Sequence, residues 1–359
     1  MRIAIIAPPW VAVPPPAYGG TEAVLDNLAR GLQAAGHDVL LCAAGDSTCP
    51  VPRVATRPCG AGTDATTPAT ELHHVVNAYE QALRWGADVV HDHTLTGPAY
   101  AQRFDVPVVT TNHAPFESEL GDYYRAIARA TPVIAVSHHH ASTARDTPIA
   151  AVIHHGIDVD LFPLGAGDGG CAVFLGRMSP DKGVHRAARI ARAAGVPLKI
   201  AAKLREPAEH EYYDATVAPL LGGDIEYVGE VNGAEKLELL ASAMCLLNPI
   251  AWPEPFGLAM VEALACGTPV VAPPCGSVPE IVEDDVVGFV RPDEEAMSAV
   301  LQRVDELDRA QCRKRAERCF STSLMVTKHL ELYQRVVTTG VSAAPSHREP
   351  GCLMPTAPA

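Results

Sequence analysis

Two glutamates mark a stretch of the chain that is otherwise almost without charge. Glu262 is the only charged residue between positions 256 and 279, and Glu254 precedes it in the turn WPEPFG. A carboxylate in an apolar helix is costly to desolvate unless hydrogen bonds compensate. We therefore interpret both carboxylates as hydrogen-bond acceptors for one polar ligand. The backbone amides that would lie between them belong to Phe256, Gly257 and Leu258.

Two cations flank a turn in the run FLGRMSPDKG. Arg177 and Lys182 follow an apolar strand-like segment, and α/β folds bind ligands at such strand ends. A guanidinium donates in a fork and an ammonium acts as a point charge, so the pair suits a diphosphate. A solvated surface turn is the alternative for this motif taken alone. Beside such cations, a shared ligand explains Glu254 and Glu262 better than the acid/base pair of a glycosidase.

Two further features follow strands in the first half of the chain. Gly19 and Gly20 precede a helix-like segment, where exposed amides and the helix dipole favour an anion. A tight turn is the commoner role of such a pair. No G-x-G-x-x-G follows the first strand, which argues against a nicotinamide dehydrogenase. His113 ends the strand-like run PVVTTNH, where a ligand-binding role and a structural role are equally open.

Histidines gather at two other places without the spacing of a metal site. In VVHDHT, strand alternation puts His91 and His93 on one side and Asp92 on the other. The consecutive histidines at 138–140 point in different directions on a helix. Shared ligation of a metal is disfavoured at both places, and we expect no bound metal and no cofactor.

The bulk composition excludes several classes of protein. The chain has 359 residues, 48% hydrophobic and 19% charged, which is typical of a globular protein of two domains. A net charge of −14 argues against nucleic acid as a partner. No segment approaches the length of a transmembrane helix and the N-terminus does not resemble a signal peptide, so we expect a cytoplasmic protein.

Two blocks of alternating strand-like and helix-like segments predict an α/β fold. Short buried runs separated by helices are typical of parallel, doubly wound, Rossmann-like sheets, and a cleft between two such halves is a natural ligand site. A Pro- and Gly-rich linker at 161–170 separates the blocks. We expect domains at 1–163 and 171–322, a helix at 323–337 that packs back on the first domain, and a disordered tail at 338–359.

The motifs together resemble a known family. The chain is similar to the retaining, nucleotide-sugar-dependent glycosyltransferases of family 4, which have the GT-B fold and an E-x7-E motif. The resemblance rests on YGGTE, TNH, GRMSPDKG, YVGEV and PEPFGLAMVEALACGTPVVAPPCGSVPE. The opening APPWVAVPPPAYGGTE resembles a bacterial subgroup that includes glucosyltransferases acting on small soluble acceptors. The long motif is highly specific, whereas the glycine turns alone are not.

The resemblance implies roles for the residues around the donor. Arg177 and Lys182 would hold the donor diphosphate, and Gly19 and Gly20 would approach it with backbone amides. His113 would reach the donor sugar from the first domain.

The remaining donor contacts implied by the resemblance come from the second half. Glu254 would bind hydroxyls of the sugar, Glu262 would bind the ribose, and the backbone at Val228 and Gly229 would meet the base. One departure from the family is His155 in HHGID, where Asn is frequent.

The implied activity is the transfer of a hexose from a nucleotide-diphosphate sugar, with UDP as the expected nucleotide, to an acceptor hydroxyl. The anomeric configuration would be retained, no metal would be required, and the first domain would bind the acceptor. Its loops at 10–18, 45–70 and 114–122 would select a small molecule, a glycan or a lipid-linked acceptor, and peripheral membrane contact stays open. The alternatives are a GT-B epimerase or phosphorylase, and a non-catalytic nucleotide-sugar-binding protein.

Overall fold

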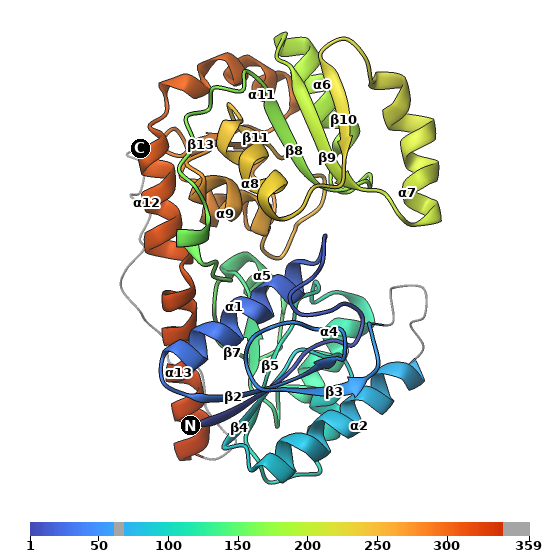
Figure 1. The fold of residues 1–359 in the computed structure, drawn as a ribbon, viewed down its shortest axis with the longest axis vertical. Helices are drawn as coiled ribbons and strands as arrows, with labels where there is room; N and C mark the ends of the chain where they lie inside the picture. Colours follow the sequence, from blue (N-terminus) through green and yellow to red (C-terminus); the bar gives the residue numbers. More distant parts are fainter. Residues whose placement is uncertain (61–67, 340–359) are drawn as a thin grey trace.

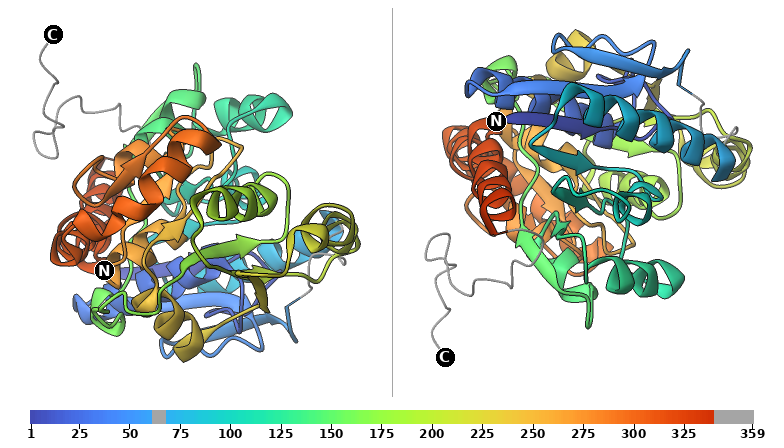
Figure 2. Two further views of the ribbon diagram at one scale, coloured as in Figure 1. Left: turned by 90° about the horizontal axis from the view of Figure 1, so that it is seen from above. Right: turned by 90° about the horizontal axis from the view of Figure 1, so that it is seen from below.

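The computed structural model describes residues 1–60 and 68–339. They form two parallel β-sheets, one in each half of the chain, and helices cover both faces of each sheet (Figures 1 and 2). In an interior strand of the first sheet, Ile3 and Ile5 pack with one layer of helices, and Ala4 and Ile6 pack with the other. This alternation explains why the strands read as continuous apolar runs. The prediction of two Rossmann-like halves is confirmed.

The first sheet has seven strands in the order β3-β2-β1-β4-β5-β6-β7. Every neighbouring pair is parallel. The strands are β1 (Arg2–Ile6), β2 (Asp38–Ala44), β3 (Arg53–Arg57), β4 (Val89–Asp92), β5 (Val108–Thr111), β6 (Val133–Ala135) and β7 (Ile149–Val152). The helices of this half are α1 (Gly20–Ala34), α2 (Pro68–Trp85), α3 (Gly97–Ala101), α4 (Ser118–Ile127) and α5 (His138–Thr143).

The second sheet has six parallel strands in the order β10-β9-β8-β11-β12-β13. The strands are β8 (Ala172–Arg177), β9 (Leu198–Lys203), β10 (Ile225–Gly229), β11 (Leu246–Leu247), β12 (Val270–Ala272) and β13 (Gly288–Val290). The helices are α6 (Val184–Ala194), α7 (Pro207–Tyr212), α8 (Gly233–Ser242), α9 (Leu258–Ala265), α10 (Val278–Ile281), α11 (Glu294–Val300) and α12 (Arg309–Phe320). Short 3-10 turns cover Val159–Leu161, Ala218–Leu220 and Leu301–Glu306, and a π turn covers Tyr213–Val217.

The last helix, α13 (Thr322–Thr339), returns to the first sheet (Figure 1). Its buried residues Met325, Val326 and Tyr333 belong to the same apolar cluster as Leu25 and Leu28 of α1. The chain therefore crosses between the two halves twice, and the crossings are hydrogen-bonded to each other. The amide of Ile157 donates to the carbonyl of Phe320 at 2.9 Å, and the amide of Thr322 donates to the carbonyl of Ile157 at 2.9 Å.

Two segments differ from what the sequence indicates. Residues 45–70 were expected to form one long loop, but they contain the edge strand β3 and the first turn of α2. The expected tail begins at residue 338, whereas α13 continues to Thr339. Residues 340–359 of that tail, and residues 61–67 of the expected loop, lie outside the described residues. No helix among the described residues is long and apolar enough to cross a membrane.

Candidate functional site

The N-terminus of α1 faces the N-terminus of α9 across the junction of the two halves. Gly20 is the first residue of α1, and a Cβ added there would lie 3.4 Å from Leu258 Cδ1, on the first residue of α9. Gly257 precedes α9 with φ +97°, a left-handed conformation that suits glycine. Gly19 caps α1 in an extended conformation and packs against Pro15. Two sets of unpaired helix amides therefore meet in one place, as an anion site requires.

Lys182 and Glu254 form an ion pair beside the N-terminus of α9. The Lys182 ammonium contacts Glu254 Oε1 and lies 5.6 Å from the centre of the Trp252 ring. The two side chains are 11% and 18% exposed. The loops that carry them are joined by a backbone hydrogen bond, because the amide of Ala251 donates to the carbonyl of Asp181 at 2.8 Å. This geometry places a cation and a carboxylate at the same end of α9.

Arg177 lies at the end of β8 and is held by its own loop. Its Nη2 donates to Asp181 Oδ2 at 3.1 Å, and its Nε donates to Ser179 Oγ at 3.4 Å. Asp181 precedes Lys182, so one short loop carries both predicted cations. The Arg177 side chain remains partly exposed, with donors left for a ligand.

Glu262 lies on α9 and has a partner that sequence reasoning did not assign to the site. The ammonium of Lys236, on α8, donates to Glu262 Oε1 at 2.7 Å. The desolvation cost of this carboxylate is therefore partly offset inside the protein, not only by a ligand. Nothing in the spacing of these residues indicates the pair, because it joins two separate helices.

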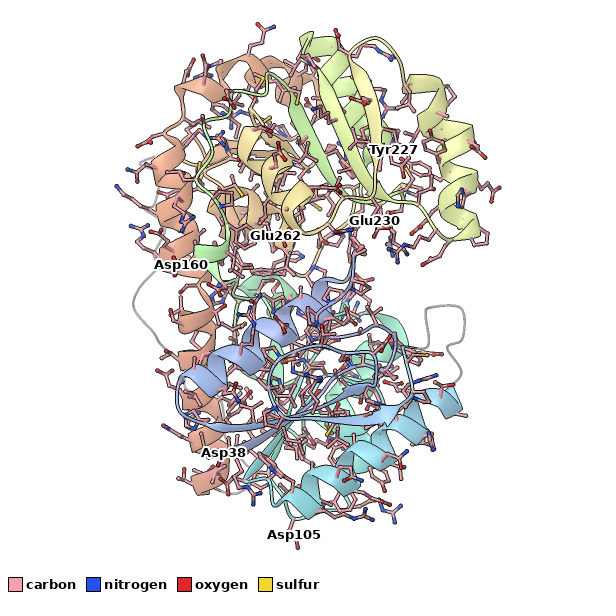
Figure 3. All side chains as sticks on the ribbon, in the orientation of Figure 1. Asp38, Asp105, Asp160, Tyr227, Glu230 and Glu262 are labelled. Atoms are coloured by element: carbon pink, nitrogen blue, oxygen red, sulfur yellow. The ribbon has the colours of Figure 1, made fainter. Side chains whose placement is uncertain are left out.

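Val228 and Gly229 end strand β10, and the residue after them reaches the first half of the chain. Glu230 Oε1 accepts the backbone N–H of Tyr18 at 2.9 Å, and its Oε2 accepts Arg205 Nε at 2.9 Å. Figure 3 shows Glu230 and Glu262 on the side of the second half that faces the first. The loop after β1 thus touches the end of β10, which brings the carboxyl ends of both sheets together.

His113 follows β5 and connects to the second half through aromatic rings. It shares a hydrogen bond with His93, between His113 Nε2 and His93 Nδ1 at 2.9 Å. Its ring stacks on that of His155 at 5.3 Å, and His155 meets the edge of Phe256 at 5.0 Å. His155, the departure from the family pattern, therefore lies between His113 and the loop that starts α9.

Glu22, in the first turn of α1, is a buried carboxyl group that sequence reasoning did not select. It is 7% exposed, and burial raises its pKa from 4.5 to about 7, although a hydrogen bond from its own backbone lowers it in part. Because the folded protein holds this proton more tightly than the unfolded chain, the group stabilises the fold fully below pH 4.5. That contribution falls as the pH rises towards 7.

The Glu22→Gln substitution should therefore flatten the pH dependence of stability. Relative to the variant, the wild type should lose roughly 3 kcal/mol of unfolding free energy between pH 4.5 and pH 7. Urea denaturation at several pH values measures this difference, with Glu80→Gln on the exposed face of α2 as the control. Parallel pH profiles of wild type and Glu22→Gln would contradict the assignment.

One group of possible metal ligands converges within the described residues. His138, His154 and Glu280 each offer an atom within 4.8 Å of the others. The Glu280 carboxylate accepts the amides of His138 at 2.8 Å and His139 at 2.6 Å, and it lies 2.8 Å from His154 Nε2. These contacts link α10 to the start of α5, so the group has a structural role that needs no metal. Asp92 points away from His91 and His93 and accepts the Tyr79 hydroxyl at 2.7 Å.

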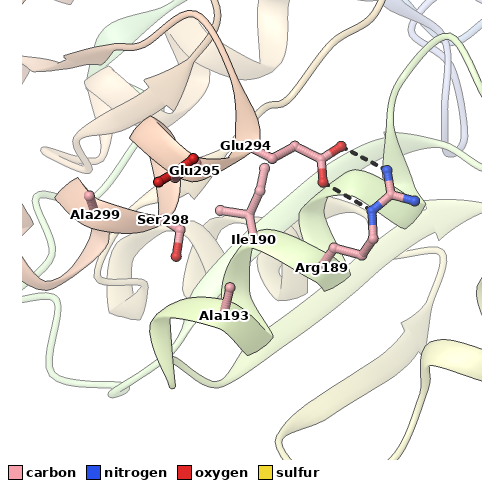
Figure 4. Close-up of a pocket in the computed structure, with 7 residues that line it drawn as sticks. All are labelled: Arg189, Ile190, Ala193, Glu294, Glu295, Ser298 and Ala299. Atoms are coloured by element: carbon pink, nitrogen blue, oxygen red, sulfur yellow. Dashed lines mark hydrogen bonds and ion pairs between the residues drawn. The ribbon is translucent and has the colours of Figure 1, made fainter.

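A hollow of the surface lies away from these residues. It has a volume of about 440 Å³ between α6 and α11, and none of the predicted site residues lines it (Figure 4). Arg189 and Glu294 pair within it at 2.7 Å, so the charges there satisfy each other. The convergence of strand ends and helix N-termini, not this hollow, defines the candidate site.

Family comparisons agree with the fold. The description "Glycosyltransferase Family 4" matches residues 18–161, and "Glycosyl transferases group 1" matches residues 165–319. The phosphatidyl-myo-inositol mannosyltransferase of Mycolicibacterium smegmatis is 27% identical, with 95% of each chain covered. The glycogen synthase of Mycobacterium tuberculosis is 28% identical over 90% of this chain and 91% of its own.

Solved structures extend the likeness to three dimensions. AviGT4, a glycosyltransferase of avilamycin A biosynthesis, is 26% identical with a TM-score of 0.71 and covers 94% of this chain and 98% of its own. Anabaena HepE, solved with UDP and glucose, has the same fold at 19% identity, with a TM-score of 0.73 and coverage of 93% and 99%. The fold and the family matches define a GT-B glycosyltransferase that uses a nucleotide-sugar donor. Within that class, the chain belongs to glycosyltransferase family 4.

Proposed function

We propose that the protein transfers a hexose from UDP-hexose to an acceptor hydroxyl, with retention of anomeric configuration and without a metal ion. The observation that carries the proposal is the meeting of the α1 and α9 N-termini beside Lys182 and Glu254. A nucleotide sugar combines a dianion with hydroxyl groups, and this arrangement offers amides and a cation for the former and a carboxylate for the latter.

The diphosphate is assigned to the space between the two helix N-termini. Arg177 approaches from the end of β8, Lys182 approaches from the loop after it, and the amides at Gly19 and Gly20 approach from α1. Lys182 contacts Glu254, so a bound diphosphate would either share the ammonium with this carboxylate or take its place. The charge that develops on the departing diphosphate would be stabilised by groups already in position.

The hydroxyl groups of the donor are assigned to the two carboxylates. Glu254 lies beside Gly257 and would accept hydroxyls of the hexose, while the amides of Phe256, Gly257 and Leu258 line the start of α9. Glu262 lies farther along the same helix and would accept the ribose hydroxyls through the oxygen that Lys236 leaves open. The order sugar, diphosphate and ribose, which is the order of the groups in the donor, then runs along the start of the helix.

The base is assigned to the backbone at Val228 and Gly229, next to the contact between Glu230 and Tyr18. The choice of uracil rests on the solved relatives: Anabaena HepE was crystallised with UDP and with UDP-glucose. Their 19% and 18% identity supports the fold, and the base itself is our proposal.

Retention of configuration follows from the family and is consistent with the polar groups at the junction. Glu254 is paired with Lys182, which suits a hydrogen-bond acceptor better than a free nucleophile. Catalysis would then rest on the positioning of donor and acceptor and on stabilisation of the leaving diphosphate. His113 would contact the sugar from the first domain. We assign residues 1–163 to this domain and its loops to the acceptor, and we assign residues 171–322 to the donor domain.

Calorimetric titration with UDP, GDP, ADP and TDP tests the donor site. We expect UDP to bind in the micromolar range, the Arg177→Ala variant to bind it at least tenfold more weakly, and chelation of metals to change nothing. Arg189→Ala, which removes an exposed Arg from the hollow between α6 and α11, is the matched control. Tighter binding of another nucleotide would replace UDP in the proposal, and no binding by any of the four would reject the assigned site.

The stereochemical part of the proposal needs turnover. Proton NMR of the first product formed from an α-linked UDP-hexose should show an α-linked product. A β-linked product would contradict retention. Nucleotide binding without turnover on any acceptor or on water would favour a nucleotide-sugar-binding protein instead.

A further inference from the structure

Four imidazole rings form a continuous row from the interior of the first sheet to the start of α9. His91 and His93, on β4 and just after it, have ring centres 4.0 Å apart. His93 and His113 share a hydrogen bond of 2.9 Å, and His113 stacks on His155 at 5.3 Å. The row ends where His155 meets Phe256, next to the residue that caps α9.

The inner end of the row is fixed by hydrogen bonds at both ring nitrogens. His91 Nδ1 lies 2.6 Å from the hydroxyl of Tyr333 on α13, and His91 Nε2 lies 2.8 Å from Thr111 Oγ1 on β5. The side chain is completely buried. The ring of His93 packs against this fixed ring at a tilt of 40°, which restricts its orientation.

The rings of His93 and His113 are neutral in the folded protein. Desolvation lowers the pKa of His113 to about 3 and the pKa of His93 well below its ordinary value. A neutral imidazole has one N–H donor and one bare acceptor nitrogen. The hydrogen bond between the two rings therefore has two possible directions, and each direction fixes the tautomer of His113.

The surroundings of His93 favour one of the two directions. His93 Nε2 is buried and has no hydrogen-bond partner among the described residues. If His113 donated from Nε2, the proton of His93 would lie on this buried Nε2 as an unpaired N–H. Orphaned buried N–H groups are rarer than under-satisfied acceptors. The lower-cost arrangement has His93 Nδ1–H donating to His113 Nε2, which leaves the proton of His113 on Nδ1.

We propose that His93 is a positioning residue that holds His113 in the Nδ1–H tautomer and presents this N–H to an oxygen of the donor sugar. The oxygen would belong to a hydroxyl group or to the bond that breaks. His113 is only partly buried, and among residues 1–60 and 68–339 its hydrogen bond to a side chain uses Nε2, which leaves Nδ1 for a ligand. The tautomer follows from this structure alone, whereas the contact with the sugar rests on the proposed function.

The tautomer can be observed without substrate. In protein labelled with ¹⁵N-histidine, long-range ¹H–¹⁵N correlation spectra distinguish protonated from bare ring nitrogens, and the His113 signals are assigned by their loss in His113→Gln. We expect Nδ1 of His113 to carry the proton in the wild type. A proton on Nε2 of His113 would overturn the inference.

Two substitutions at His93 separate donation from packing. The amide nitrogen of Asn takes the place of His Nδ1, so His93→Asn keeps a donor for His113, whereas His93→Leu fills the space without one. We expect His93→Leu to mix the tautomers of His113 and to lower kcat roughly tenfold, with UDP affinity and thermal midpoint close to those of His93→Asn. His93→Asn should restore most of the lost rate. Equal kcat in the two variants would reject the positioning role.

Different results would contradict the tautomer of His113 and its contact with the sugar. If the wild type shows the Nδ1–H tautomer but no variant at 93 or 113 changes turnover, the contact with the sugar is wrong. If the wild type transfers no sugar at all, the proposed function fails while the spectra still decide the tautomer.

Discussion

Replacing Lys182 with alanine should slow the breaking of the bond between the sugar and the diphosphate roughly 100- to 1000-fold. The loss of one preorganised hydrogen-bond donor has an effect of this size in other enzymes. The side chain is the most enclosed of the predicted site cations, and its ammonium lies beside the helix end that would face the diphosphate. In the transition state the diphosphate gains negative charge, so the lost interaction is stronger there than in the ground state. The effect should therefore appear in kcat more than in KM.

Because Lys182 is paired with Glu254, the substitution needs a control for the loss of that pair. Lys182→Ala leaves Glu254 without its partner, and the bare carboxylate would repel the diphosphate. Comparing Lys182→Ala, Glu254→Gln and the double variant separates this repulsion from the loss of the cation. Arg189→Ala, whose side chain is 49% exposed and paired with Glu294, should leave the rate unchanged. A Lys182→Ala enzyme within threefold of the wild type would remove Lys182 from the catalytic site.

Glu262→Gln should raise the KM for the donor about tenfold, equivalent to about 1.4 kcal/mol, with little change in kcat. A carboxylate accepts hydroxyl hydrogen bonds more strongly than an amide oxygen does, and the ribose is bound equally in the ground state and the transition state. Lys236→Met tests the partner separately, because it keeps the carboxylate and removes the ammonium that contacts Oε1.

Deoxynucleotides identify the contact that Glu262 makes. If its carboxylate binds the ribose, 2′-deoxy- or 3′-deoxy-UDP should bind more weakly than UDP to the wild type, and Glu262→Gln should reduce that difference. Glu295→Gln, an exposed glutamate on α11, serves as the control for charge alone. The same penalty for the missing hydroxyl in wild type and Glu262→Gln would place Glu262 away from the ribose.

The central strands of both sheets could be predicted from the sequence, and the edge strands of the first sheet could not. β1 and β4 are buried on both faces and read as continuous apolar runs. β3 and β7 lie at the two edges of their sheet, where the residues are only partly buried. Their sequences RVATR and IAAV therefore carry a weaker pattern, and β3 was taken for part of a long loop.

The positions of the candidate site residues could also be predicted in part. The rule that ligands bind at carboxyl strand ends led to Arg177 and His113, whereas Gly229 was named from the family resemblance alone. The pairing between side chains was beyond the sequence, because Lys182 and Glu254 are 72 residues apart. Lys236 lies 26 residues from Glu262, and no local periodicity connects two positions on different helices.

Buried polar groups were the hardest part of the site to predict from the sequence. Glu22 stands in the motif YGGTE, where a glutamate in the first turn of a helix is ordinary. Only the packing around α1 shows that this carboxyl group is removed from water. The same holds for His93, just after β4. Its place on the same side as His91 was predicted, but its hydrogen bond to His113 depends on the pairing of β4 with β5.

The return of α13 to the first sheet has a consequence for recombination between relatives. The second family match stops at residue 319, yet the helix after it covers Leu25 and Leu28 in the first half. A chimera that took everything after the linker from another family member would join this α1 to a foreign last helix. The unit that can be exchanged is instead an insert, roughly residues 165–320, set into a frame made of the first half and α13. The donor contacts of the second half would then travel in the insert, while the acceptor loops and the histidine row, which is anchored at Tyr333 and carries His113, would stay in the frame.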